Sequence, residues 1–100
     1  MFIMAKGYWV TCYRSVKDPA VLADYARLAG PAITGGGGRF VVRGNPVKTC
    51  EAGLSQRVVI IEFESVEKAI ETYESTEYQA ALAILKGHAE RDIRFVEGPE

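Results

Sequence analysis

Residues 57–63 read Arg-Val-Val-Ile-Ile-Glu-Phe, and they are the most strand-like stretch of this 100-residue chain. Four β-branched residues in a row, 58–61, precede one carboxylate, Glu62, and then Phe63. A nearly continuous apolar strand is typical of a sheet whose two faces are both covered. The sequence therefore predicts a central strand, and each of its faces needs a covering layer.

Three other segments have the composition of strands. They are residues 6–16 (KGYWVTCYRSV), 39–43 (RFVVR) and 93–97 (IRFVE), which are rich in Val, Ile, Thr and aromatic residues. Gly, Asn and Pro interrupt the second of these strands at 44–46, and residues 47–51 can continue it beyond a bulge or bend. The chain is therefore expected to contribute four strands.

Helices are predicted between the strands. The Asp-Pro pair at 18–19 starts the first, because Asp caps a first turn and Pro fits the first helical position. Gly-Pro at 30–31 should end or kink this helix, and the four glycines at 35–38 close it. Ser65 caps a second helix, and residues 76–79 (TEYQ) form a capping box that restarts it after a break.

The order of elements is therefore β-α-β-β-α-β. With right-handed crossovers, this order predicts a ferredoxin-like α+β sandwich, a four-stranded antiparallel sheet with two helices on one face, formed by residues 1–100 as a single domain. Two helices cover only one face, yet alternate residues of the first strand are largely apolar on both faces. These two sets are Tyr8, Val10, Cys12 and Trp9, Thr11, Tyr13. A second copy packed sheet to sheet would cover the other face, so a homodimer or a higher oligomer is expected.

Composition excludes several classes of protein. The chain is 48% hydrophobic and 25% charged, with 12 basic and 13 acidic residues, so nucleic acid is not an expected partner. No apolar run is long enough to span a membrane, and residues 1–4 lack the features of a signal peptide, so a cytoplasmic location is expected. Cys12 is expected to be a small buried thiol and Cys50 a loop thiol, both reduced.

No cofactor or metal is expected. One histidine and two isolated cysteines do not make a ligand set, and His88 is expected to be a solvated residue near the end of the last helix. The four glycines at 35–38 resemble a phosphate cradle, but no Gly-Lys-Ser/Thr follows them and the next element is a strand. They are better explained as a connection with positive φ angles.

Glu62 is the most informative residue because it places a carboxylate in an apolar strand. A buried carboxylate needs a partner or a proton. In a hairpin of the two middle strands Arg43 is near enough in register to reach it, and Arg39 is a second candidate. The pair is either an ion pair that closes the strand end or a catalytic base beside a substrate-binding guanidinium.

Aromatic side chains provide a candidate ligand site. Tyr25, Tyr73 and Tyr78 lie on helix faces that should meet the sheet, and Trp9 lies in the first strand. Most such aromatics are core residues, but their polar atoms still need partners when buried. With Arg39, Arg43 and Glu62 they could line a small apolar cavity with a few polar points.

Several segments together resemble the bacterial family known as domain of unknown function 1330. These segments are 6–9 (KGYW), 38–44 (GRFVVRG), 57–65 (RVVIIEFES), 73–79 (YESTEYQ) and 96–98 (VEG). The family usually has a proline where this chain has Glu64 or Thr76, and a second glycine in place of Asn45. The resemblance implies a dimeric α+β barrel in which two ferredoxin-like sheets face each other.

The superfamily of that barrel includes cofactor-free oxygenases, lactone isomerases, haem-degrading enzymes and ligand-sensing domains, so the resemblance indicates a fold rather than an activity. Three functions are open. The first is a homodimer that binds a small aromatic or carboxylate-bearing molecule between sheet and helices. The second is a cofactor-free oxygenase or isomerase that uses Glu62 and Arg43. The third is an assembly module without a ligand.

Overall fold

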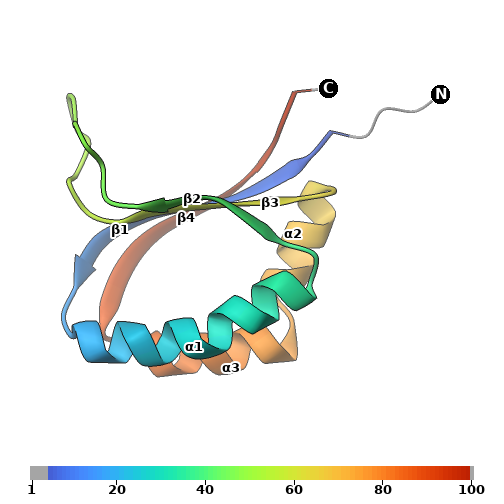
Figure 1. The fold of residues 1–100 in the computed structure, drawn as a ribbon, viewed down its shortest axis with the longest axis horizontal. Coiled ribbons are helices and arrows are strands. Elements are labelled where there is room, and N and C mark those ends of the chain that lie inside the picture. The colour runs from blue at the N-terminus through green and yellow to red at the C-terminus, as the bar shows by residue number, and fades with distance from the viewer. Residues whose placement is uncertain (1–4, 100) are drawn as a thin grey trace.

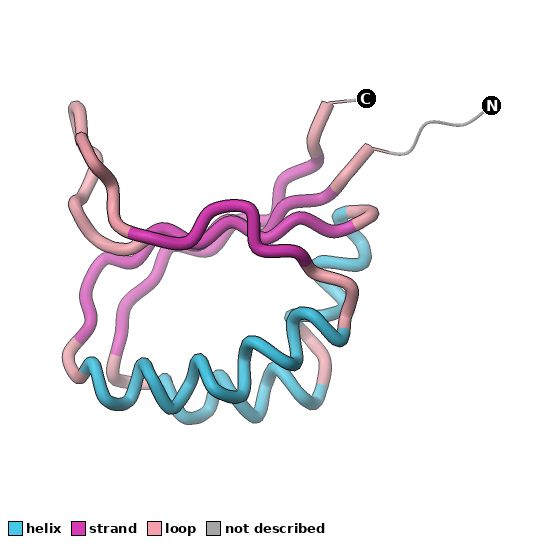
Figure 2. The backbone as a smooth tube through the Cα atoms, in the orientation of Figure 1, coloured by secondary structure: helices cyan, strands magenta, loops and turns pink. Residues whose placement is uncertain are grey.

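The computed structural model describes residues 5–99, and it has the predicted order of elements with the second helix divided in two. Strands β1 (Gly7–Val16), β2 (Arg39–Gly44), β3 (Val58–Phe63) and β4 (Ala89–Glu97) form one antiparallel sheet in the order β2-β3-β1-β4. Helices α1 (Pro19–Gly35), α2 (Val66–Tyr73) and α3 (Thr76–Leu85) all lie on one side of it (Figure 1, Figure 2). The predicted ferredoxin-like fold is confirmed.

Two sequence expectations concern the chain ends and the membrane. The prediction that the chain lacks a signal peptide depends on residues 1–4. These residues lie outside the described part of the chain. None of the helices within 5–99 combines the length and the apolar character that a membrane crossing requires.

Side-chain caps start all three helices. Asp18 caps α1 and Ser65 caps α2, as predicted, each accepting a hydrogen bond from a backbone N–H of the first turn. The cap of α3 is Ser75 rather than Thr76, which is the first helical residue. The capping box was therefore placed one residue too late, because Ser and Thr at neighbouring positions can both serve as caps.

Helix α1 continues through its Gly-Pro pair. Pro31 lies inside the helix, so the helix does not end at 30–31 but at Gly35, where the glycines were expected to close it. A proline removes one backbone hydrogen bond, but the following turn is anchored because Ile33 is only 3% exposed against the sheet. Only Gly37 among residues 35–38 has a positive φ, at 97°.

Other boundaries also differ from the prediction. Strand β4 begins at Ala89, four residues before the predicted start, and residues 47–51 form no strand. The irregularity of β2 is a bulge between Phe40 and Val42, within the strand rather than beyond it. On α2, Ile70 is 38% exposed, whereas Ala69 and Thr72 are buried.

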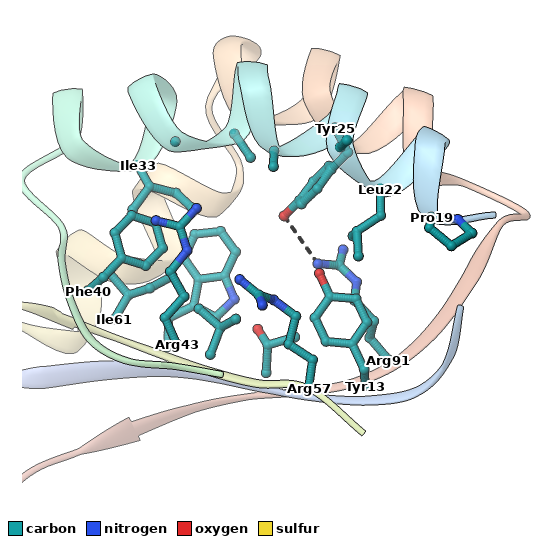
Figure 3. Close-up of a pocket in the computed structure, with 17 residues that line it drawn as sticks. Tyr13, Pro19, Leu22, Tyr25, Ile33, Phe40, Arg43, Arg57, Ile61 and Arg91 are labelled. Atoms are coloured by element: carbon teal, nitrogen blue, oxygen red, sulfur yellow. Dashed lines mark hydrogen bonds between the residues drawn. The ribbon is translucent and has the colours of Figure 1, made fainter. Parts of the chain in front are cut away.

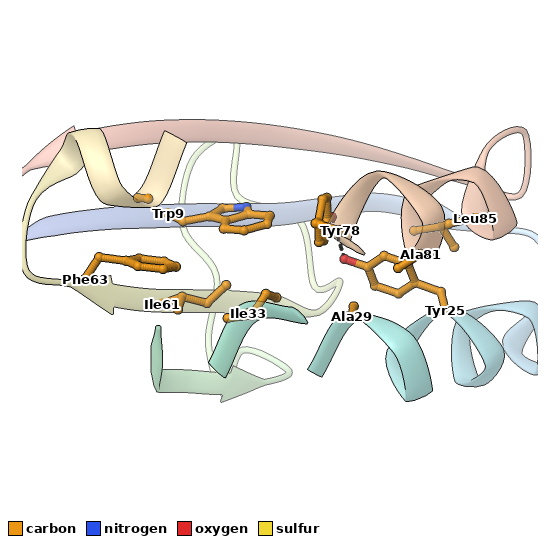
Figure 4. Packing of buried hydrophobic residues seen from close by; sticks show 10 residues of the cluster. Trp9, Tyr25, Ala29, Ile33, Ile61, Phe63, Tyr78, Ala81 and Leu85 are labelled. Atoms are coloured by element: carbon orange, nitrogen blue, oxygen red, sulfur yellow. Dashed lines mark hydrogen bonds between the residues drawn. The ribbon is translucent and has the colours of Figure 1, made fainter. Parts of the chain in front are cut away.

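The core lies between the sheet and the helices and is centred on Trp9. The indole is 1% exposed and contacts the rings of Phe63, Tyr73, Tyr78 and Phe95, with the Tyr78 centroid at 4.7 Å (Figure 4). Edge-to-face contacts such as that with Tyr78 are favourable beyond the area that they bury. These contacts attach α2 and α3 firmly to β1, β3 and β4.

The opposite face of the sheet has no covering layer within the described chain. The connection between β2 and β3 and both ends of the traced chain rise on this side, away from the helices (Figure 1). Cys12 lies on this face and is exposed, so the expectation that it is buried is wrong. Cys50 is an exposed loop thiol, as expected.

Gly7 allows β1 to pass close to the start of α2. A Cβ atom on Gly7 would lie 2.2 Å from the backbone nitrogen of Val66, whereas a Cβ on Gly44, at the end of β2, would meet nothing within 4 Å. We expect Gly7→Ala to lower the free energy of unfolding by about 2 kcal/mol or more, because backbone cannot yield as a flexible side chain does. Gly44→Ala should change it by less than about 0.5 kcal/mol. Urea unfolding measures both, and equal effects would contradict this account of the β1–α2 contact.

Candidate functional site

A cavity of about 250 Å³ lies between the sheet and α1 (Figure 3). Its floor is the helix-facing side of β1, where alternation places Trp9, Thr11 and Tyr13 together. Its roof is a stretch of α1 that carries small side chains where it faces the sheet. These roof residues are Ala23, Ala26, Ala29 and Gly30. Because such residues do not reach the sheet, a space remains that larger side chains would have filled.

Three arginines point into this cavity. Arg43 comes from β2, Arg57 precedes β3 and Arg91 comes from β4 (Figure 3). No ion pair joins any of them to a carboxylate of residues 5–99, although five other basic residues of that range form one. The lining contains no Asp, Glu, Lys or His, so the cavity is apolar in its walls and cationic overall.

Arg91 is held by two tyrosines. Its guanidinium donates hydrogen bonds to the hydroxyls of Tyr25 at 3.2 Å and Tyr78 at 3.3 Å, and these two hydroxyls lie 2.6 Å from each other. The guanidinium also lies over the rings of Tyr13 and Tyr25. Burial raises the pKa values of Tyr25 and Tyr78 above the ordinary tyrosine value, so both phenols are neutral at physiological pH. The charge of Arg91 therefore meets oxygen dipoles and ring faces but no anion.

One buried donor at the cavity has no partner. The Nε1–H of Trp9 makes no hydrogen bond within the described part of the chain, although the residue is 1% exposed. Buried polar groups are nearly always paired. This indole N–H is enclosed by the core and, among residues 5–99, is left without a partner there.

Glu62 lies on the opposite, open face of the sheet. Its carboxylate accepts hydrogen bonds from Arg39 at 2.8 Å and from the Tyr8 hydroxyl at 2.9 Å. These hydrogen bonds, first that of Arg39 and then that of Tyr8, hold the pKa of Glu62 below its ordinary value. The carboxylate is thus ionised and already partnered.

Comparison with known proteins assigns the fold to a family. Residues 6–99 match the family described as Domain of unknown function (DUF1330). The chain belongs to this family. A comparison with curated proteins found no match.

Solved structures share the fold. A protein of unknown function from Rhodopseudomonas palustris aligns with a TM-score of 0.73 and 17% identity, over 98% of this chain and 85% of that one. A dimeric ferredoxin-like protein of unknown function from Thermobifida fusca gives 0.64 and 15%, over 97% and 94%. SnoaB, a cofactor-independent oxygenase from Streptomyces nogalater, gives 0.62 and 10%, over 96% and 95%.

The predicted pair of Glu62 and Arg43 does not form. Arg39, the second candidate, is the partner of Glu62, and Arg43 lies on the helix-facing side over the ring of Phe40. The bulge in β2 is the reason. Simple alternation places Arg39 and Arg43 on one face, but one extra residue between Phe40 and Val42 turns Arg43 to the other.

The predicted ligand-binding residues also separate into groups. Trp9 and Tyr25 line the cavity, and Tyr78 lies behind Tyr25 with its hydroxyl on that of Tyr25. Tyr73 packs against Trp9 in the core and does not line the cavity, while Arg39 lies on the open face. Of the five predicted ligand-binding residues, this DUF1330 protein therefore places only Trp9 and Tyr25 in the cavity wall.

Sequence reasoning missed two of the three cavity arginines. Arg91 would have been found had the last strand been started earlier, because Arg91, Ile93 and Phe95 then alternate onto one face. Arg57 precedes a strand, and nothing in its local sequence indicates which way it points. His88 is exposed and lies just beyond the end of α3, before β4, in agreement with the expected solvated position near the helix end.

The Glu62 cluster should make stability depend on pH. Because the folded pKa of Glu62 is lowered from 4.5, its contribution is fully present above about pH 4.5 and is lost as pH falls through the folded pKa. The free energy of unfolding, measured with urea between about pH 5 and 3, should therefore fall less steeply with decreasing pH in Glu62→Gln than in the unsubstituted chain. Glu64→Gln, at an exposed neighbour, is the control and should leave the slope unchanged. Equal slopes for Glu62→Gln and the unsubstituted chain would contradict the role of this cluster.

Proposed function

We propose that the protein is a homodimer, each protomer of which binds a small aromatic or carboxylate-bearing molecule in the cavity between the sheet and α1. The observation that carries the proposal is the set of three arginines in an otherwise apolar cavity that contains no acidic residue. Arg57 and Arg91 are half-buried, Arg43 is exposed, and none of them has a carboxylate partner among residues 5–99. A partly desolvated guanidinium without a counter-charge is unfavourable. A bound organic anion would supply that charge, and its hydrocarbon part would pack against the apolar walls.

The dimensions and walls of the cavity favour a small, flat ligand. A volume of about 250 Å³ is close to the lower end of the range of ligand pockets, about 300–1,000 Å³. Aromatic rings line it through Trp9, Tyr13 and Phe40, and Arg43 and Arg57 lie where they can pair with a carboxylate in a bidentate manner. A single-ring aromatic acid meets these requirements.

The alternative of a catalytic Glu62 and Arg43 is not supported by their positions. One lies on the open face and the other in the cavity, so they cannot act on one substrate within a protomer. SnoaB is described as a cofactor-independent oxygenase, but likeness at 10% identity concerns the fold alone. The positions of Glu62 and Arg43 on opposite faces of the sheet therefore favour ligand binding over a reaction catalysed by this pair.

Dimerisation is supported by the open face of the sheet. Val42 and Val96 are 43% and 48% exposed there, beside Val10 and Ile60. The charges on this face pair among themselves, Arg39 with Glu62 and Arg94 with Asp92, so a covering layer need not neutralise them. A second copy would also cover Val47, which is fully exposed in the rising β2–β3 connection. Two of the similar structures are described as dimeric.

Sedimentation tests the dimer. The protein should sediment as a dimer at micromolar concentration, and the double substitution Val42→Asp/Val96→Asp should shift it to a folded monomer, because it places two charges in an apolar contact. Leu28→Asp on α1 is the matched control, since Leu28 is 49% exposed but lies away from the open face, and it should leave the dimer intact. A stable monomer of the unsubstituted chain would refute the dimer.

Isothermal titration tests the ligand. We expect 3-nitrobenzoate to bind, and Arg43→Gln/Arg57→Gln to weaken binding by about tenfold or more, because charge-assisted hydrogen bonds are lost. The neutral analogue 3-nitrobenzamide should bind weakly and equally to both forms. Arg27→Gln, on the exposed side of α1, is the control. Absence of binding by aromatic acids, with no molecule co-purifying in native mass spectrometry, would favour the assembly module.

A further inference from the structure

The hydroxyls of Tyr25 and Tyr78 share one hydrogen bond, and their surroundings favour one of its two possible directions. The two oxygens are 2.6 Å apart, so one proton lies between them, and both oxygens accept from Arg91, which has no acceptor of its own. Tyr78 is fully buried, does not line the cavity, and has no other acceptor for its proton among residues 5–99. The burial of Tyr78 and the position of Tyr25 at the cavity favour Tyr78 as the donor to Tyr25, because the proton of Tyr25 can then find a partner in the cavity.

This arrangement leaves the proton of Tyr25 without a partner. The Tyr25 oxygen accepts from Tyr78 and from Arg91, which uses both of its acceptor sites. Tyr25 lines the cavity, so its free O–H is available to a ligand there. A ligand atom beside Tyr25 therefore meets a phenolic donor and a guanidinium. It meets no unused acceptor of the cluster formed by Tyr25, Tyr78 and Arg91.

A ligand atom at that position must accept hydrogen bonds and is most strongly bound when it is negative. We propose that the cavity binds a hydroxyaromatic carboxylate as its phenolate, with the phenolate oxygen held by Tyr25 and Arg91 and the carboxylate directed toward Arg57 and Arg43. The inference rests on the proposed binding function and names its ligand class. Figure 3 places Arg91 at one end of the cavity with Tyr13 and Tyr25, and Arg43 at the other with Phe40.

Ionisation of the ligand follows from the charges around it. The titratable and charged groups that line or back the cavity are Tyr13 from β1, Tyr25 from α1, Arg43 from β2, Arg57 before β3, Arg91 from β4, and Tyr78 from α3 behind Tyr25. None is anionic, and the tyrosines keep their protons because burial opposes their ionisation. The ligand O–H bond breaks heterolytically, its electron pair remains on oxygen, and its proton passes to bulk water.

The phenol pKa of a bound chromophore tests this inference. The probe is 4-hydroxy-3-nitrobenzoate, whose phenolate absorbs at longer wavelength than its phenol, in a region where protein does not absorb. We expect the apparent phenol pKa of the bound probe to fall by about one unit or more below that of the free probe, which is a tenfold preference for phenolate. Tyr25→Phe should remove most of this fall, and Tyr73→Phe, a core tyrosine outside the cavity, should retain it.

A second ligand separates the inference from the proposed function. 3-Nitrobenzoate has no hydroxyl, and its binding to Tyr25→Phe verifies that the variant is folded and that its cavity still admits an aromatic acid. Binding of 3-nitrobenzoate with an unchanged or raised pKa of the hydroxylated probe would overturn the phenolate assignment alone. Retention of the full pKa fall in Tyr25→Phe, or failure of the probe to bind where 3-nitrobenzoate binds, would do the same. Failure of both ligands to bind would refute the binding function and this inference with it.

Discussion

The packing of Trp9 determines how far the helices lie from the sheet. Its ring meets Tyr78 of α3 edge to face and Tyr73 of α2. Helix α2 lies close to the sheet, whereas α3 runs beside α1 and reaches the sheet through the Tyr78 side chain (Figure 1). Helix α1 turns mainly small residues toward the same floor and therefore stands away from it. The large side chain of Trp9 fills the space beneath one part of the helical layer, whereas the small side chains of α1 leave space beneath the other. Protein interiors are otherwise closely packed, so a cavity remains only where side chains are too short to fill it.

The fold was predictable because each of its signals is local. Alternation, caps and the order of elements specify the antiparallel sheet and its helices, and even the passage of α1 through Pro31 changes a boundary rather than the topology. The candidate site was less predictable because it depends on which face each side chain takes. One bulge in β2 moves Arg43 across the sheet, and an earlier start of β4 brings Arg91 into register with Ile93. Neither event has a marker in the sequence, since a bulge is fixed by the pairing of two strands.

The bulge also separates two electrostatic environments. On the open face Arg39 has Glu62 within 2.8 Å, so the pair is neutral and compatible with an apolar covering layer. In the cavity Arg43 has a ring face, and no acidic residue lines the space around it. Had β2 been regular, alternation would have placed Arg43 on the same open face as Arg39 and left the cavity with less positive charge. The bulge thus leaves Arg39 on the face proposed to form the dimer interface and turns Arg43 toward the cavity.

Arg91, like Arg43, has no carboxylate partner among the described residues, although no bulge is needed to turn it into the cavity. It is half-buried and bonded to two phenols that burial keeps neutral, so its position is fixed while its charge is not cancelled. If its role were only structural, a neighbouring carboxylate would satisfy it at least as well, as Asp92 satisfies Arg94 two residues later on the other face of the same strand. Neutral partners orient a guanidinium but leave its attraction for an anion intact. The two tyrosines are therefore better understood as the support of a binding group than as its counter-charge, because orientation without neutralisation is what recognition of an anion requires.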